Sequence, residues 1–179
     1  MKLNKFILSI SLAFGVVSFS QAATDPTADL GHGTVTFTGS IVEAPCSIDS
    51  ETIDQTVNLG QVSNVSLDNK GASTPKSFEI RLEKCNVGDK GKSVTAKFTG
   101  AEGSTAGLLG ITGTAKGASI AVMDGKGTLL ELGKSTDAQK LQNGNNTLLF
   151  SAYLQGDGAS SGVVPGDFTS IANFTLDYQ

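Results

Sequence analysis

Alternation between apolar and polar residues, with a period of two, dominates this chain. Because successive side chains of a strand point to opposite faces, each such run predicts a strand with one buried face. The pattern predicts strands over residues 33–48, 55–62, 77–84, 93–99, 118–123, 128–132, 146–154 and 170–178. Turn signals separate them, and Asp124-Gly125 between two short apolar runs predicts a hairpin. Short strands without a sustained helical period predict an all-β sandwich.

The first predicted strand is unusual because small residues lie on its apolar face. The positions on that face are Gly33, Val35, Phe37, Gly39 and Ile41. Two glycines there would leave the core of an ordinary sandwich underfilled. They would suit a strand that slides into a groove made by another subunit. The alternative is that this segment is simply the first strand of a self-contained domain.

The last predicted strand carries three large side chains on one face, Phe174, Leu176 and Tyr178. Polar residues occupy the opposite face. An unpaired strand edge recruits other chains. Two such strands, near opposite ends of the mature chain, would therefore be a hazard in a monomer and an advantage in a protein that polymerises.

The first 22 residues predict a secretory signal peptide, with Lys2 and Lys5 ahead of an apolar run and Ser20-Gln21-Ala22 as the cleavage site. Cleavage would leave 179 − 22 = 157 residues, the usual size of one domain. We divide these into an N-terminal extension, 23–42, and a body, 43–179. Export places the chain in an oxidising compartment, where its two cysteines, Cys46 and Cys85, would form a disulfide.

Charge and composition argue against several kinds of function. Without Lys2 and Lys5 the chain has 11 basic and 17 acidic residues, a net charge of 11 − 17 = −6, which argues against nucleic-acid binding. The single histidine, His32, lies in a polar arm, so a His-based catalytic triad is not expected. Two cysteines and one histidine do not complete a structural zinc site without carboxylates. We therefore expect no enzymatic activity, no cofactor and no metal.

Acidic side chains raise two further possibilities, neither of which the pattern favours. Glu79 and Glu83 could form an acid/base pair. Both, however, lie on the polar face of a predicted strand, which is typical of a solvated surface. Four others flank the first cysteine without the regular ligand spacing of a calcium loop: Glu43, Asp49, Glu51 and Asp54.

Several motifs together resemble the type 1 fimbrial major subunits of the chaperone-usher pathway in Gram-negative bacteria. In chain order they are residues 33–39 (GTVTFTG), Ala44-Pro45-Cys46, residues 55–62 (QTVNLGQV), residues 143–150 (NGNNTLLF) and residues 174–179 (FTLDYQ). The resemblance spans essentially the whole mature chain. The order of the motifs, the cysteine spacing and the Tyr-Gln ending carry it.

This resemblance implies an incomplete immunoglobulin-like β-sandwich that lacks its final strand and has one disulfide. In the family, a periplasmic chaperone first fills the resulting groove, and the leading segment of the next subunit then replaces it by donor-strand exchange. The five apolar-face positions of the first predicted strand would be the donor residues. The three of the last strand would pair with the chaperone and later line the groove.

The resemblance also implies export through the periplasm and an outer-membrane usher to a fimbria on the cell surface, where the polymer of identical or related subunits contributes to adhesion. Two alternatives remain open at this point. One is a minor adaptor pilin of the same pathway. The other is a self-contained secreted sandwich that binds carbohydrate, although the chain has no Trp and only two Tyr.

Overall fold

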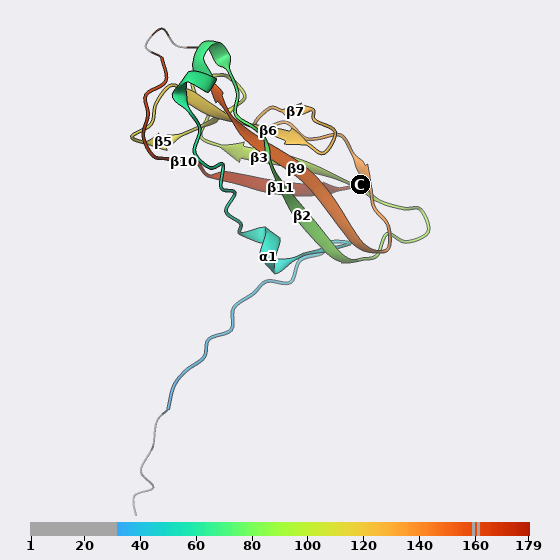
Figure 1. The fold of residues 1–179 in the computed structure, drawn as a ribbon. Coiled ribbons are helices and arrows are strands. Elements are labelled where there is room, and N and C mark those ends of the chain that lie inside the picture. The colour runs from blue at the N-terminus through green and yellow to red at the C-terminus, as the bar shows by residue number, and fades with distance from the viewer. Residues whose placement is uncertain (1–31, 159, 161) are drawn as a thin grey trace, which may run out of the picture. The chain divides into compact units, whose positions relative to one another are not determined.

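The computed structural model describes residues 32–158, 160 and 162–179. The predicted signal peptide and residues 23–31 of the predicted extension lie outside the described residues. The chain divides into two compact units, Met1–Ser40 and Ile41–Gln179. Of the first unit, residues 32–40 are described, and they are exposed and form neither helix nor strand. The second unit, which we call the body, is built of strands (Figure 1).

The body contains one short α-helix, one 3-10 helix and eleven strands among its described residues. These are β1 (Ser47–Ile48), α1 (Ser50–Ile53), the 3-10 helix η1 (Asn64–Lys70), β2 (Lys76–Cys85), β3 (Ser93–Gly100), β4 (Leu109–Gly110), β5 (Thr112–Gly113), β6 (Ala118–Asp124), β7 (Leu129–Leu130), β8 (Gln139–Lys140), β9 (Gly144–Gly156), β10 (Phe168–Thr169) and β11 (Ala172–Tyr178).

The larger sheet has the strand order β1-β2-β9-β6-β4, with β7 paired to β6. All its pairings are antiparallel, and Ile80 opposite Leu148 fixes the register between β2 and β9, the two longest strands. The predicted hairpin at Asp124-Gly125 is confirmed. The Asp124 carboxylate stabilises this turn by accepting hydrogen bonds from the amides of Lys126 and Thr128, at 2.9 and 2.8 Å.

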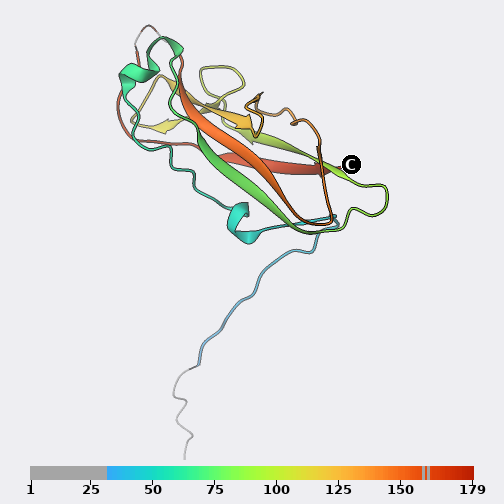
Figure 2. The same cartoon turned by 45° about the vertical axis from the view of Figure 1, so that its right-hand side comes forward.

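The smaller sheet has the order β11-β3-β8, and β5 and β10 form a separate two-stranded ribbon. Figure 2 shows the two layers, with β2 and β9 on one side and β3 and β11 on the other. The core lies between them. It is filled by the inward side chains of both sheets, among them Ile80, Leu82, Val94, Leu148 and Leu154. The predicted all-β sandwich is therefore confirmed, because alternation places one apolar face of each sheet toward the other.

Two of the predicted strands are wrong in most of their length. Of residues 33–48 only Ser47–Ile48 form a strand, and residues 55–62 contain no strand. The prediction at 128–132 shortens to Leu129–Leu130. The alternation at these positions is real, but a strand also requires a neighbour to receive its backbone hydrogen bonds. Residues 55–62 have no such neighbour in the described part of the body.

The predicted disulfide is present. Cys46 and Cys85 are joined, both are buried, and their Cα atoms are 4.1 Å apart. The bond ties the start of the body to the end of β2. Next to it, the Asn86 amide donates a hydrogen bond to the Pro45 carbonyl, at 2.8 Å. The N-terminal edge of the body is thus attached to one of its longest strands.

Candidate functional site: an open groove in the body

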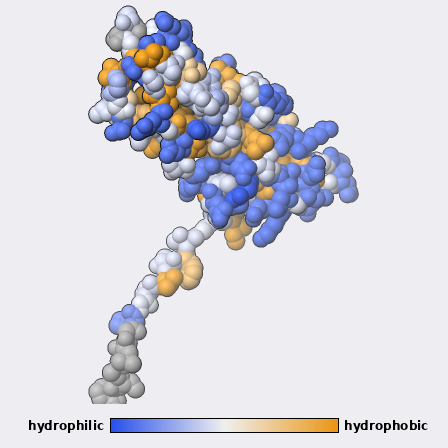
Figure 3. Space-filling model, in the orientation of Figure 1, coloured by the Kyte–Doolittle hydropathy of each residue, from blue (hydrophilic) through white to orange (hydrophobic). Residues whose placement is uncertain are grey.

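A long groove of about 1430 Å³ opens along one side of the body. One wall is the segment 53–62, which begins at the last residue of α1. The other is formed by residues 163–174, which lead into β11. The floor is apolar and includes Phe78, Phe98, Leu109 and Ile120. Figure 3 shows hydrophobic side chains reaching the surface of the body between hydrophilic ones.

Both walls of the groove carry backbone that has no strand partner. β11 pairs with β3 through residues Ala172 to Tyr178, and no second strand pairs with it among the described residues. The segment 53–62 belongs to neither sheet. Since an unpaired strand edge offers amides and carbonyls to a further strand, the groove can receive one extended segment between its two walls.

Amide side chains join the edge of the smaller sheet to the larger sheet. Gln139 of β8 donates a hydrogen bond to the carbonyl of Thr147 in β9, at 3.1 Å. Asn146 exchanges two hydrogen bonds with the backbone of Gln142, at 2.8 and 2.9 Å. In contrast, β11 has β3 on one side and no strand on its other side among the described residues, so its free edge offers a place where an added strand could pair.

Four aromatic rings form a continuous layer from the core to the groove. Phe98 lies 5.0 Å from Phe150 and 6.1 Å from Phe78, edge to face in both cases, and Phe174 of β11 lies 6.4 Å from Phe98. Phe174 is half-buried and lines the groove. Its ring presents apolar surface that an incoming side chain could cover.

The other two predicted groove residues lie further along the same face of β11. Leu176 is opposite Ala96 and Tyr178 is opposite Val94, so both point inward, and both are half-buried against the core. Neither lines the groove itself. Burial raises the pKa of the Tyr178 phenol above its ordinary value of 10.0, because the charged form loses water.

A strap of residues 163–170 forms the part of the second wall that precedes β11. The Asp167 amide donates a hydrogen bond to Thr114 Oγ1, at 3.0 Å, and the Asp167 carbonyl accepts from the Thr114 amide, at 3.0 Å. Val164 and Lys116 exchange two backbone hydrogen bonds, at 2.9 and 3.2 Å. Earlier in the chain, the Asp157 carboxylate accepts hydrogen bonds from Ser119 and Thr105, at 2.6 and 3.0 Å.

The five predicted donor residues are all exposed in this structure. Val35 and Phe37 are 74% and 90% exposed, and Ile41, the first residue of the body, is fully exposed. A side chain added at Gly33 or Gly39 would meet no atom within 4 Å. The apolar face of the segment is therefore available for burial.

Sequence reasoning located β11 but missed most of the rest of the groove. It assigned residues 55–62 to a paired strand and gave no role to the strap. The apolar residues Val57 and Leu59 were a usable signal, since they do pack against the core. What their spacing does not reveal is that the backbone beside them is unpaired.

Two other classes of site are not found in the described residues. No group of three or more His, Cys, Asp or Glu side chains lies close enough to hold a metal ion. No described helix is both long and apolar enough to cross a membrane. The acidic residues Asp49, Glu51 and Glu79 are paired with Arg81 on the outer face of β2; Glu51 is exposed and Glu79 is half-exposed there, whereas Asp49 is largely covered.

Comparison with known proteins identifies the family of this chain. The sequence pattern of the fimbrial protein family matches residues 35–179. The Fimbria A protein of Serratia marcescens is 56% identical over 180 residues, and the major MR/P fimbria protein of Proteus mirabilis is 49% identical over 181 residues; both alignments cover the whole of each chain. A solved structure of a chaperone-usher pilus superimposes with a TM-score of 0.74 at 33% identity, covering 87% of this chain and all of that one.

The solved pilus structure shares the sandwich, and the two relatives compared by sequence match the chain from end to end. The open side between β11 and residues 53–62 is consistent with an immunoglobulin-like sandwich that lacks one strand. The chain therefore belongs to the fimbrial protein family, a family of structural pilins and not of enzymes.

Proposed function

We propose that this chain is a structural subunit of a surface fimbria, and that it polymerises head to tail when residues 33–42 of one subunit fill the groove of the next. The observation that carries the proposal is a groove with an apolar floor, flanked on one side by the free edge of β11 and on the other by residues 53–62, which belong to neither sheet. Such a contact joins two different surfaces of identical chains, so it propagates without closing on itself. A fibre is the expected product.

The dimensions of the segment suit the groove. Ten residues in extended conformation span roughly 33 Å, enough to run the length of the seven-residue strand β11 and beyond it. Val35, Phe37 and Ile41 alternate with polar residues, so one face would enter the groove and the other would face solvent. The glycines at 33 and 39 would let the backbone approach the walls where no side chain fits.

The energetics of such a contact are balanced. Burial of the three large side chains contributes ~1.5 to 3 kcal/mol each, and about eight new backbone hydrogen bonds contribute ~0.5 to 1.5 kcal/mol each. The sum is ~9 to 21 kcal/mol. Ordering ten backbone residues costs ~10 to 20 kcal/mol. A loosely seated strand would therefore gain little, and a durable fibre requires close packing and slow dissociation.

An exposed groove of this kind needs protection before assembly. We infer that a periplasmic chaperone pairs with β11, through Phe174, Leu176 and Tyr178, and is later displaced by the donor segment, and that an outer-membrane usher receives the complex. The sequence resemblance and the unpaired edge of β11 support this order of events. A fimbria on the cell surface, acting in adhesion, is the destination. The relative named a major fimbria protein favours a rod subunit over a minor adaptor.

A self-contained carbohydrate-binding sandwich would use its first strand inside its own sheet. Residues 33–46 instead contain no strand, and the predicted donor side chains are exposed. This is what a subunit that lends its leading segment to a neighbour requires. The groove floor is lined by Phe, Leu and Ile and not by the exposed Trp or Tyr platforms on which sugars stack.

Size-exclusion chromatography of the mature chain, with and without residues 23–42, tests the proposal. Both forms are expressed without a chaperone. The full mature chain is expected to form polymers, and the shortened chain is expected to form none until a synthetic peptide of residues 33–42 is added, when it becomes a stable one-to-one complex. A monomeric full chain, or polymers that do not depend on the segment, would contradict the proposal.

A further inference from the structure

The wall formed by residues 53–62 is attached to the body by few backbone bonds. Upstream, β1 pairs with β2 over only two residues, Ser47 and Ile48, and the Asp49 amide donates to the Arg81 carbonyl at 2.9 Å. Downstream, backbone attachment to a sheet resumes at residues 71–73, which bond to the end of β9. Between these points the described structure records no backbone hydrogen bond from the wall to either sheet.

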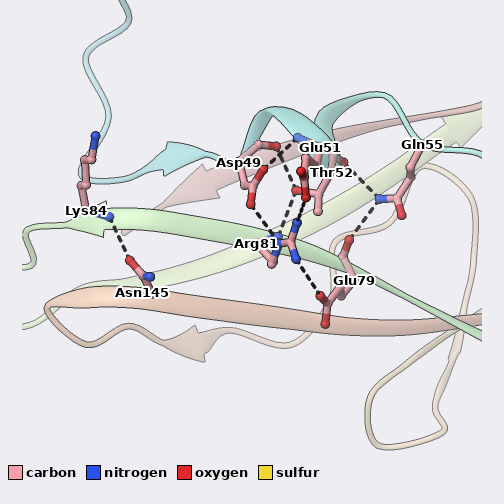
Figure 4. Close-up of polar contacts among 8 residues, drawn as sticks. All are labelled: Asp49, Glu51, Thr52, Gln55, Glu79, Arg81, Lys84 and Asn145. Atoms are coloured by element: carbon pink, nitrogen blue, oxygen red, sulfur yellow. Dashed lines mark hydrogen bonds and ion pairs between the residues drawn. The ribbon is translucent and has the colours of Figure 1, made fainter.

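One side chain, Arg81 of β2, holds the start of this wall. Its Nη2 lies 2.7 Å from Glu51 Oε2, its Nε 2.9 Å from Asp49 Oδ2, and its Nη1 3.7 Å from Glu79 Oε1. Its backbone amide also donates to Thr52 Oγ1, at 3.2 Å. Figure 4 shows α1 lying over β2 with Asp49, Glu51 and Thr52 turned toward the guanidinium.

The same contacts stabilise α1 and the residues that follow it. Asp49 caps the helix, since its Oδ1 accepts from the Glu51 amide at 2.8 Å while its Oδ2 faces Arg81. Gln55, in the groove wall, donates hydrogen bonds through its Nε2 to the carbonyls of Thr52 in α1 and Glu79 in β2, both at 3.0 Å. The wall is thereby held against β2 through side chains.

The contact between α1 and β2 depends on the positive charge of Arg81. Three carboxylates surround one guanidinium, and Arg81 Nε is buried without a hydrogen-bond partner, so its contact with Asp49 is an ion pair held by charge. The Asp49 side chain is only 15% exposed, whereas Glu51 is 80% exposed. Without the cation, Asp49, Glu51 and Glu79 would lose their shared partner and repel one another, which weakens the attachment of α1 to β2.

We propose that Arg81 is a positioning residue for assembly: its ion pairs hold the 53–62 wall in place and so set how long a strand stays seated in the groove. This inference rests on the proposed function, because it assigns the occupant of the groove to the leading segment of a second copy of the chain. Both Ile53, the last residue of α1, and Val57, four residues later, line the groove. A wall that detaches at α1 uncovers one side of the seated strand.

The test compares four mature full-length chains. Three are wild type, Arg81→Gln and, as the matched control, Lys76→Gln, which removes the same charge from the same strand. Hydrogen–deuterium exchange is measured on residues 50–62 and on β3 and β11. Polymers of each chain are then placed in denaturant and the release of subunits is timed. Arg81→Lys is included as a variant that keeps the charge but loses the planar guanidinium.

In Arg81→Gln, hydrogen–deuterium exchange over residues 50–62 is expected to be faster, whereas exchange in β3 and β11 is expected to be unchanged. Subunits are expected to leave the polymer about three- to tenfold faster, which is the size expected for the loss of several partly exposed ion pairs. Lys76→Gln should match wild type and Arg81→Lys should be intermediate. Unchanged exchange over 50–62, faster exchange everywhere, or local loosening without faster release would each overturn the proposal.

The two proposals fail in different ways. If wild-type polymers do not depend on residues 33–42, the proposed function fails whatever Arg81 does. If wild-type polymers form as expected and Arg81→Gln leaves the exchange of residues 50–62 unchanged, only the role of Arg81 fails. Should Arg81→Gln not fold, Arg81→Lys carries the same comparison with a smaller expected change.

Discussion

Phe37 is the residue on which the proposed contact can be tested most sharply. It is 90% exposed in this structure, so nearly all of its side chain is available for burial in a neighbour. Burying a Phe contributes ~1.5 to 3 kcal/mol relative to leaving it exposed. At about 1.4 kcal/mol per factor of ten, Phe37→Ala in the donor segment should weaken its binding about 10- to 150-fold.

The assay uses synthetic peptides of residues 33–42 as inhibitors of polymerisation of the mature chain, followed by light scattering. The peptide concentration that halves the rate is compared for the wild-type sequence, Phe37→Ala and Thr36→Ala. Thr36 is the matched control, since alternation places it on the opposite face of the strand. Its substitution should change the inhibitory concentration by less than about threefold, within the usual range of a surface change.

Two results would refute this reasoning. Equal inhibition by the wild-type and Phe37→Ala peptides would show that Phe37 is not buried in the contact. Equal losses for Phe37→Ala and Thr36→Ala would show that the segment binds without a defined face, and hence not as a strand. In the intact chain, a charged residue at position 37 should block assembly but leave chaperone capture largely unchanged, because the donor segment acts after capture.

Three further predictions concern the body itself. The free energy of unfolding should fall as pH rises above about 10, because Tyr178 ionises there in the unfolded chain but keeps its proton up to a higher pKa in the folded chain. Tyr178→Phe should reduce this fall. Unfolding measured over a series of alkaline pH values checks it, with Tyr153→Phe as the control. Replacing both Cys46 and Cys85 by Ser should lower the free energy of unfolding by roughly 4 kcal/mol, because the disulfide closes a loop with a sequence separation of 39 residues. A loss below about 1 kcal/mol in denaturant titration would contradict that account. Ile80→Ala removes a side chain with no exposed surface between the sheets and should cost about 2 to 5 kcal/mol in the same titration; an unchanged midpoint would mean that the core closes over the cavity at little cost.

A further prediction concerns β11 and its partner before assembly. Tyr178→Ser should reduce recovery of the chaperone complex and lower the level of the subunit in the periplasm, because it removes a large half-buried side chain from the strand that the chaperone would pair with. Co-purification with the chaperone measures this directly. An unchanged yield of complex would argue against a role for Tyr178 in capture.

The amino-acid sequence by itself determined the strands that have partners within the chain. Residues 77–84, 93–99, 118–123, 146–154 and 170–178 all lie in observed strands or within two residues of their ends, because period-two alternation states which face of a strand is buried. The disulfide followed from export and the cysteine count. The apolar face of residues 33–41, with its two glycines, was also visible as a pattern.

Only the tertiary structure decided which backbone stays unpaired and what surrounds each charge. Residues 33–46 and 55–62 alternate like strands, yet they form none, because alternation specifies the faces of a strand and not the partner that accepts its hydrogen bonds. Arg81 and its carboxylates, Asp49 and Glu51, lie some thirty positions apart in sequence and meet only because α1 folds back over β2. The groove and the contacts that hold its wall are properties of that packing, which sets distances between residues that local pattern leaves free.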